Sequence, residues 1–164
     1  MFQKFIVVGV VCVLLFAGLP VGFGQAPDTR DSLADPWRVP DPTLTPGATL
    51  PVTATDICVP GYSGKVRNVP MAVRRQVWAA YGLPPQPGRG WELDHLVSLE
   101  LGGSNSPRNL WPEPGAGSMN YHNKDRLENK LHADVCSNQM PLVDAQRAIA
   151  HDWELAYHQY VEGD

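Results

Sequence analysis

Apolar residues recur with helical spacing in three segments of the chain. The first segment follows Pro70 and ends at Gly82, the second begins near Met119, and the third begins near Pro141. Proline in a first turn and glycine after a last turn are typical helix boundaries. The apolar stripes, whose members lie three, four or seven residues apart, are Val73, Val77 and Tyr81; Leu127, Leu131 and Val135; and Leu142, Ala145, Ile149, Ala156 and Tyr160. We therefore expect three helices, each with one buried face.

Between the first two of these helices the helical spacing gives way to alternation. WELDHLVSLELGG at 91–103 is typical of a strand that enters a turn, because Trp91, Leu93 and the residue two further on alternate with Glu92 and Asp94 as in a half-buried strand. NLWPEP at 109–114 predicts a second short strand that prolines end. The diglycine at 102–103 permits a tight reversal, so that Asn109 can return beside His95. The pattern as a whole predicts an α+β fold.

The first 24 residues form an apolar segment of their own. One cation, Lys4, precedes an uncharged apolar run over 5–19, and small residues follow up to Gly24. This is the pattern of a signal peptide, and the run is shorter than the roughly 20 residues of a membrane span. We expect cleavage after Gly24, a secreted, periplasmic or cell-envelope location, and no stable membrane association afterwards. The alternative is an uncleaved N-terminal anchor.

The remainder of the chain divides into a leader and one domain. Residues 25–56 contain six prolines and no apolar periodicity, which is typical of an extended, flexible leader. From residue 57 the composition becomes that of a globular protein, and a chain of 164 residues has room for one such domain. We expect this domain, 57–164, to be monomeric.

Charge limits the classes of function. The chain has 13 Lys and Arg against 17 Asp and Glu, a formal net charge of -4 at pH 7, which becomes -5 when Lys4 leaves with the first 24 residues. This excludes a generally basic nucleic-acid coat. A local phosphate site is still allowed, because net charge governs steering and solubility rather than one pocket.

Cys58 and Cys136 are the two cysteines that remain after cleavage. An even number of cysteines in an exported chain predicts a disulfide. The alternative is two free thiols, and a zinc-ligand pair has less support because the chain has no C-x-x-C spacing.

Polar residues suited to catalysis cluster in two places. Asp94 and His95 end the first predicted strand, where a carboxylate can hold a hard cation and a neutral imidazole can take a proton from water. Asn120, Lys124 and Glu128 are spaced i, i+4 and i+8, so they share one helical face. They offer an oxygen ligand, a phosphate contact and an acceptor or water-mediated ligand. The alternative is a solvated face with a Lys124–Glu128 ion pair.

Several short segments together resemble the HNH endonuclease family, and above all a group of small exported bacterial HNH-like proteins. The segments are CVPGY at 58–62, DHLVSLELGGSN at 94–105, NLWPE at 109–113, NYHNKDRLE at 120–128, VC at 135–136 and AQRAIAHDW at 145–153. The resemblance covers about 57–160, nearly the whole predicted domain. It implies a small ββα-metal core with flanking helices.

The resemblance assigns a role to each matching residue. His95 matches the general base, Asp94 the acidic metal ligand before it, and Asn109 the middle Asn, which positions the histidine loop. Asn120 is the best match to the metal ligand on the helix. His122 and Asn123 are its rivals, because the alignment of this segment is open.

Other matches and departures refine this picture. Lys124, Arg108 and Arg126 are candidates to grip flanking phosphates. Ser98 stands where many family members have proline. Paired zinc-knuckle cysteines are missing from the sequence, so the Cys58–Cys136 disulfide would have to supply the rigidity that zinc gives in other members.

The implied activity is that of an HNH-type endonuclease, which hydrolyses phosphodiester bonds. DNA is the expected substrate, and RNA is the alternative. His95 would deprotonate water, and one divalent cation on Asp94 and Asn120 would stabilise charge on the phosphate. Oxygen ligands favour Mg²⁺ or Mn²⁺ over Zn²⁺.

Two other classes of function are alternatives to the nuclease. One is a catalytically inactive HNH scaffold that binds or supports components of the cell envelope. The other is a different exported hydrolase that uses Asp94, His95 and Glu128. Serine-esterase and zinc-protease readings have no support, because the chain has no G-x-S-x-G or H-E-x-x-H motif.

Overall fold

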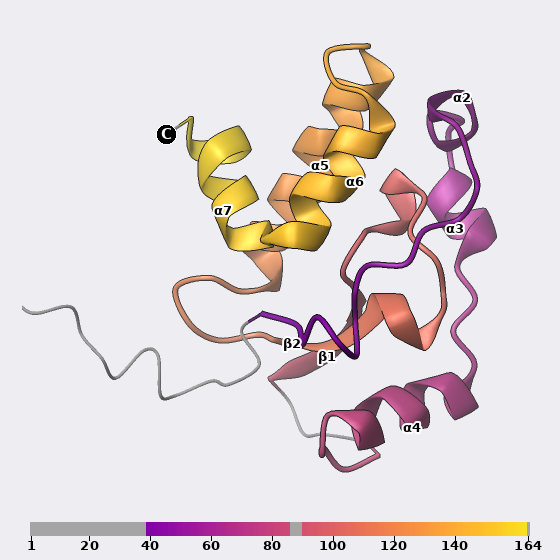
Figure 1. Cartoon of the computed structure of the whole chain (residues 1–164), viewed down its shortest axis with the longest axis vertical. Coiled ribbons are helices and arrows are strands. Elements are labelled where there is room, and N and C mark those ends of the chain that lie inside the picture. Colours follow the sequence, from indigo (N-terminus) through magenta and orange to yellow (C-terminus); the bar gives the residue numbers. More distant parts are fainter. Residues whose placement is uncertain (1–38, 86–89, 164) are drawn as a thin grey trace, which may run out of the picture.

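A computed structural model describes residues 39–85 and 90–163, and shows an α+β fold (Figure 1). The predicted signal peptide lies outside the described residues, as does the leader before residue 39. The elements in chain order are α2 (Ala54–Ile57), α3 (Tyr62–Val66), α4 (Met71–Ala80), β1 (Trp91–His95), the 3-10 turns η1 (Leu99–Leu101) and η2 (Pro107–Asn109), β2 (Leu110–Pro114), α5 (Tyr121–Cys136), α6 (Leu142–His151), α7 (Trp153–Tyr157) and the π-helical turn η3 (His158–Glu162). Among these described helices, none is long and apolar enough to cross a membrane.

The two strands form one antiparallel hairpin, in which His95 lies opposite Leu110 and Glu92 lies opposite Glu113. Both predicted strands are therefore present. All of β2 is buried, because α4 packs against it and the helices α5 to α7 lie across the hairpin from α4 (Figure 1). Trp111 is fully buried in this strand.

Helix α5 confirms its predicted core stripe. Leu127, Leu131 and Val135 are all at most 2 % exposed. Full burial of side chains of this kind contributes about 1.5 to 3 kcal/mol each. The stripe fixes how the helix is rotated, and so determines which of its polar residues face the hairpin.

The third predicted helix is divided in two. Asp152 has extended backbone angles (φ -161°, ψ 98°), and its carboxylate accepts a hydrogen bond from Leu155 N–H, so that α6 ends there and α7 begins. A side chain that caps the backbone locally competes with a continuous helix. The apolar positions on both sides of the break still face one core, and Ala145, Ile149 and Ala156 are buried.

Part of the predicted leader packs on the domain. Thr45 is 1 % exposed, and its hydroxyl contacts Tyr81 Oη at 2.8 Å and donates to Leu110 O at 2.9 Å. Thr49 forms a β-bridge with Gly103. The packed part of the chain thus begins before residue 57, because scattered polar and apolar groups of 39–56 dock individually and need no periodic pattern.

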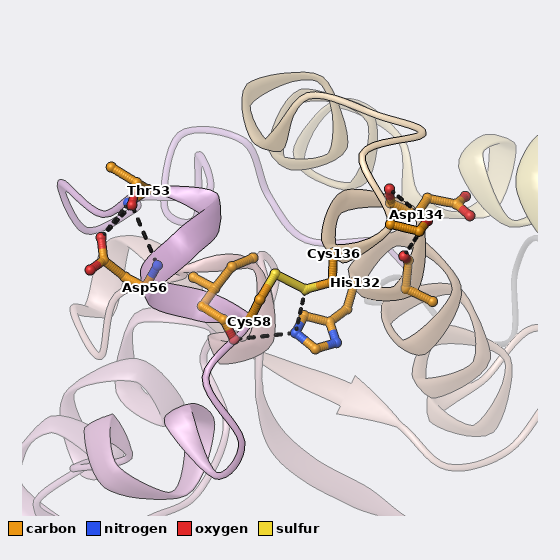
Figure 2. The surroundings of a disulfide bond; sticks show 9 residues. Thr53, Asp56, Cys58, His132, Asp134 and Cys136 are labelled. Carbon is orange, nitrogen blue, oxygen red and sulfur yellow. Dashed lines mark hydrogen bonds between the residues drawn. A yellow bond between two sulfur atoms is a disulfide. The ribbon is translucent and has the colours of Figure 1, made fainter.

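The disulfide joins α2 to α5, and the sequence predicts this cysteine pair. Cys58, which caps α2, is bonded to Cys136, the last residue of α5, across 78 residues of sequence (Figure 2). His132 lies one turn before Cys136, and its Nε2 is 3.4 Å from Cys136 Sγ and 3.3 Å from Ile57 O. The i,i+4 spacing indicates that His132 lies beside Cys136, but its contact with Ile57 O depends on the fold.

Candidate active site

His95 ends β1 and is held by Asn105. The His95 Nε2 lies 3.1 Å from Asn105 Oδ1, which also accepts Asn68 N–H at 3.2 Å. Asn105 Nδ2 donates to Val66 O at 2.8 Å, which fixes which end of the amide is the oxygen. The network therefore assigns the proton to Nε2 and leaves Nδ1 as the acceptor. Within the described residues, Nδ1 makes no hydrogen bond.

The imidazole of His95 is neutral at pH 7. Only 2 % of the residue is exposed, and burial lowers the pKa of His95 below its usual value. The hydrogen bond that His95 donates to Asn105 and the charge of Asp94 act in the opposite direction without reversing this shift. A neutral imidazole is the form that can accept a proton, so the protonation state suits a general base.

Asn109 ties the segment after His95 to the start of β2. Its side-chain oxygen accepts Val97 N–H at 2.9 Å, and its amide donates to Val97 O at 2.9 Å and Ser104 O at 3.0 Å. Leu96 N–H also donates to Asn109 O at 2.8 Å. Asn109 is fully buried, so all of its polar atoms serve this loop. Its role in a reaction stays a prediction.

The diglycine makes this close approach possible. Gly102 has φ +76°, which L-residues with side chains rarely adopt. A Cβ on Gly103 would lie 1.7 Å from Val97 O and 2.7 Å from Asn109 Nδ2. Only glycine fits at 103, because the loop closes on itself through Asn109.

Lys124 lies at the centre of an acidic cluster. Its Nζ donates to Asp94 Oδ2 at 2.5 Å, to the backbone oxygen of His95 at 2.8 Å and to Glu128 Oε1. Lys124 is 1 % exposed. The helical spacing correctly places Lys124 and Glu128 on one face. However, the ammonium points into the protein, and this buried position replaces the surface phosphate contact that was expected.

Glu113 belongs to the same cluster, although the sequence did not indicate it as a site residue. It is 1 % exposed and lies across the ladder from Glu92. Carboxylate oxygens of Glu92, Asp94 and Glu113 lie within 4.8 Å of one another. The strand register is the signal that would have found Glu113, because residues opposite and two apart share a face of the hairpin.

The carboxyl groups of the cluster respond differently to their surroundings. Burial raises the pKa of Glu113 well above its usual value and that of Glu128 to about 8. Burial acts in the same direction on Asp94, but the Lys124 ammonium outweighs it and lowers the pKa of Asp94. For Lys124, burial is opposed by Asp94, Glu128 and Glu113, whose charges raise its pKa. Asp94 is therefore the ionised partner of the Lys124 cation at neutral pH.

Asn120 is the N-cap of α5. Its Oδ1 accepts His122 N–H at 3.0 Å, its Nδ2 donates to Gly117 O at 3.0 Å, and Asn123 completes the capping box. His122 is exposed on the first turn. Asn120 Oδ1 is thus committed to the helix cap and Asp94 Oδ2 to Lys124, so a divalent cation shared by these two oxygens would have to displace both partners. The need for Mg²⁺ or Mn²⁺ stays a prediction.

Arg108 and Arg126 lie apart from this cluster. Arg126 Nη1 donates to Tyr157 Oη, and its guanidinium lies 5.3 Å from the centre of the Tyr157 ring, so it serves the contact between α5 and α7. Arg108 is exposed in η2.

A cleft lies beside the acidic cluster. This cavity of about 610 Å³ is lined by Asp94, Glu128, Arg67, Arg74 and Trp91 among others. Arg67 also lines an adjoining cavity of about 250 Å³ together with Glu128. In the described part of the chain, the Arg67 guanidinium makes no hydrogen bond or ion pair. Arg67 was not singled out from sequence as part of the site.

The site thus combines a neutral, oriented imidazole, an internal cation among carboxylates, and arginines along an open cleft. These are components with which a protein can bind a phosphate and activate water. No family model matches the chain, and no curated protein or solved structure matches it, so the resemblance to the HNH family rests on the residues of this chain.

Proposed function

We propose that the chain is an exported, monomeric endonuclease of the HNH type, with a ββα core, which hydrolyses phosphodiester bonds in nucleic acid. DNA is the first substrate to test and RNA the second. The observation that carries the proposal is His95, a neutral imidazole at the end of β1 whose Nδ1 is left as an acceptor by the Asn105 contact. The adjoining cleft provides Arg67 and Arg74 for the phosphates.

In the proposed reaction, His95 Nδ1 takes a proton from water as the water oxygen bonds to phosphorus. The bond from phosphorus to the ester oxygen breaks, and that oxygen leaves as a hydroxyl after it takes a proton from solvent water. Asn105 and Asn109 hold the imidazole and its loop while this happens. Because His95 is 2 % exposed, the proposed reaction requires the fold to open enough for water and a phosphate to reach Nδ1. A divalent cation, which the resemblance to the HNH family implies, would stabilise charge on the phosphate.

A second candidate function is an inactive HNH scaffold of the cell envelope. Two observations favour it: the small exposure of His95, and the commitment of Asp94 to Lys124. Such a scaffold would bind without turnover, so an activity assay separates the two candidates.

We expect the purified chain to nick supercoiled plasmid DNA, and His95→Gln to reduce the rate by roughly 10²- to 10⁴-fold, the usual contribution of a general base. Gln approximates the length and polarity of His but cannot take the proton. Agarose gels of nicked against supercoiled plasmid, with Mg²⁺, Mn²⁺ or EDTA, measure the rate, and labelled RNA is tested in parallel.

The matched control is His151→Gln, because His151 is an exposed histidine at the end of α6. It should retain the native rate. Circular dichroism melts of all three proteins show whether a loss follows unfolding. Cleavage at the native rate by folded His95→Gln would refute the base assignment, and a folded native chain that cleaves neither DNA nor RNA would favour the scaffold.

A further inference from the structure

The ammonium of Lys124 has a complete set of partners. It carries three N–H donors, and three oxygens accept from it: Asp94 Oδ2 at 2.5 Å, His95 O at 2.8 Å, and Glu128 Oε1. The oxygens come from β1 and from the next turn of α5. No donor of this lysine remains for a substrate.

These three oxygens are also the kind that a hard divalent cation takes. Such ions bind carboxylates and backbone carbonyls. Here, two carboxylates and one carbonyl converge on a single point, and Lys124 Nζ occupies it. A divalent ion on Asp94 would have to lie close to a buried positive charge, or displace it.

The matching lysine on the same helix has a different setting. Lys130 pairs with Asp134 at 2.5 Å with the same i,i+4 spacing, but its side chain is 45 % exposed, whereas that of Lys124 is 1 % exposed. Helical spacing alone therefore does not explain the position of Lys124. Its burial requires the contacts with Asp94 and the His95 carbonyl, which lie on β1.

We propose that Lys124 is the resident cation of this site: its ammonium positions Asp94, Glu128 and the His95 carbonyl and excludes a divalent metal ion from Asp94. Lys124 is a positioning residue, since it touches the backbone of the base and not the substrate. The catalytic consequence rests on the proposed nuclease function, because it predicts that cleavage does not require a metal on Asp94. The exclusion of metal does not depend on that function.

Metal binding tests the proposal without any assay of activity. In the native chain, Mn²⁺ should cause no selective broadening of the amide signals of Asp94, His95 and Lys124. Lys124→Ala leaves the oxygens without their cation, and should bind Mn²⁺ roughly tenfold or more tightly than the native chain, as measured by electron paramagnetic resonance of free Mn²⁺. Lys124→Ala combined with Asp94→Asn should lose this gain.

Lys130→Ala is the matched control and should bind Mn²⁺ as the native chain does. Selective broadening at Asp94 in the native chain would overturn the proposal, and so would a folded Lys124→Ala that gains no affinity. If Lys124→Ala does not fold, the native-chain spectrum decides alone: broadening at Asp94 refutes the exclusion of metal, and unchanged signals support it.

Cleavage assays then separate this proposal from the proposed function. Nicking that persists in EDTA supports both. Nicking that needs Mg²⁺, together with Mn²⁺ bound at Asp94 in the native chain, refutes the resident cation and leaves the nuclease standing. A chain that excludes Mn²⁺ from Asp94 and cleaves nothing refutes the nuclease alone.

Discussion

Removal of the Cys58–Cys136 disulfide is expected to lower the free energy of unfolding by about 4 to 5 kcal/mol. The bond closes a loop across 78 residues, so its loss returns a large conformational entropy to the unfolded chain. It also removes the covalent link between α2 and the end of α5. Urea unfolding of a Cys58→Ser/Cys136→Ser double variant against the oxidised native chain measures the difference.

The double variant avoids the free thiol that a single substitution would leave. Reduction of the native chain with dithiothreitol should produce the same loss, and the double variant should not respond to the reductant. A difference below about 1 kcal/mol would mean that the unfolded chain is already restricted, or that the fold does not depend on this bond.

Asn109→Ala is expected to destabilise the fold by about 3 to 5 kcal/mol. The substitution leaves Val97 N–H, Val97 O and Ser104 O without their side-chain partner in a buried loop. Each buried polar group that loses its partner costs about 1 to 3 kcal/mol, although some recover by small shifts. Chemical denaturation followed by tryptophan fluorescence measures the loss.

Asn129→Ala is the control, since Asn129 is exposed on α5 and bonds only to Asp125 O. Its effect should stay within about 0.5 kcal/mol. Asn109→Asp is a sharper variant, because a carboxylate retains the size of the amide but cannot donate to Val97 O or Ser104 O. If Asn109→Asp were as stable as the native chain, the two donated hydrogen bonds would not hold this loop.

Local chemistry explains what could be predicted. Apolar spacing located α4, α5 and the buried positions of α6 and α7. Alternation located β1, and the short segment that ends at prolines located β2. The diglycine and Asn109 indicated a reversal beside His95, because turn residues act within a few positions of themselves. The cysteine pair followed from an even count in a chain expected to be exported.

The contacts of the helix face at 120–128 could not be predicted from local sequence. Spacing places Asn120, Lys124 and Glu128 in line, yet Asn120 precedes the first helical residue and uses its oxygen as the cap. The turn of α5 that contacts β1 depends on the position of the helix along the hairpin. The packing of Leu127 and Leu131 sets this position, which cannot be predicted from residue spacing.

By itself, the sequence determined the α+β class, the principal helices and strands, the disulfide, and the neighbourhood of His95 and Asn109. Periodicity and turn chemistry depend on residues that are close together in the chain, and cysteine pairing depends on only two residues. Only the tertiary structure decided the partners of the charged groups. Glu113 joins Asp94 through strand register, and Lys124 reaches Asp94 and the His95 carbonyl through the docking of α5. A buried charge requires partners from several elements at once, and those elements meet only in the folded chain.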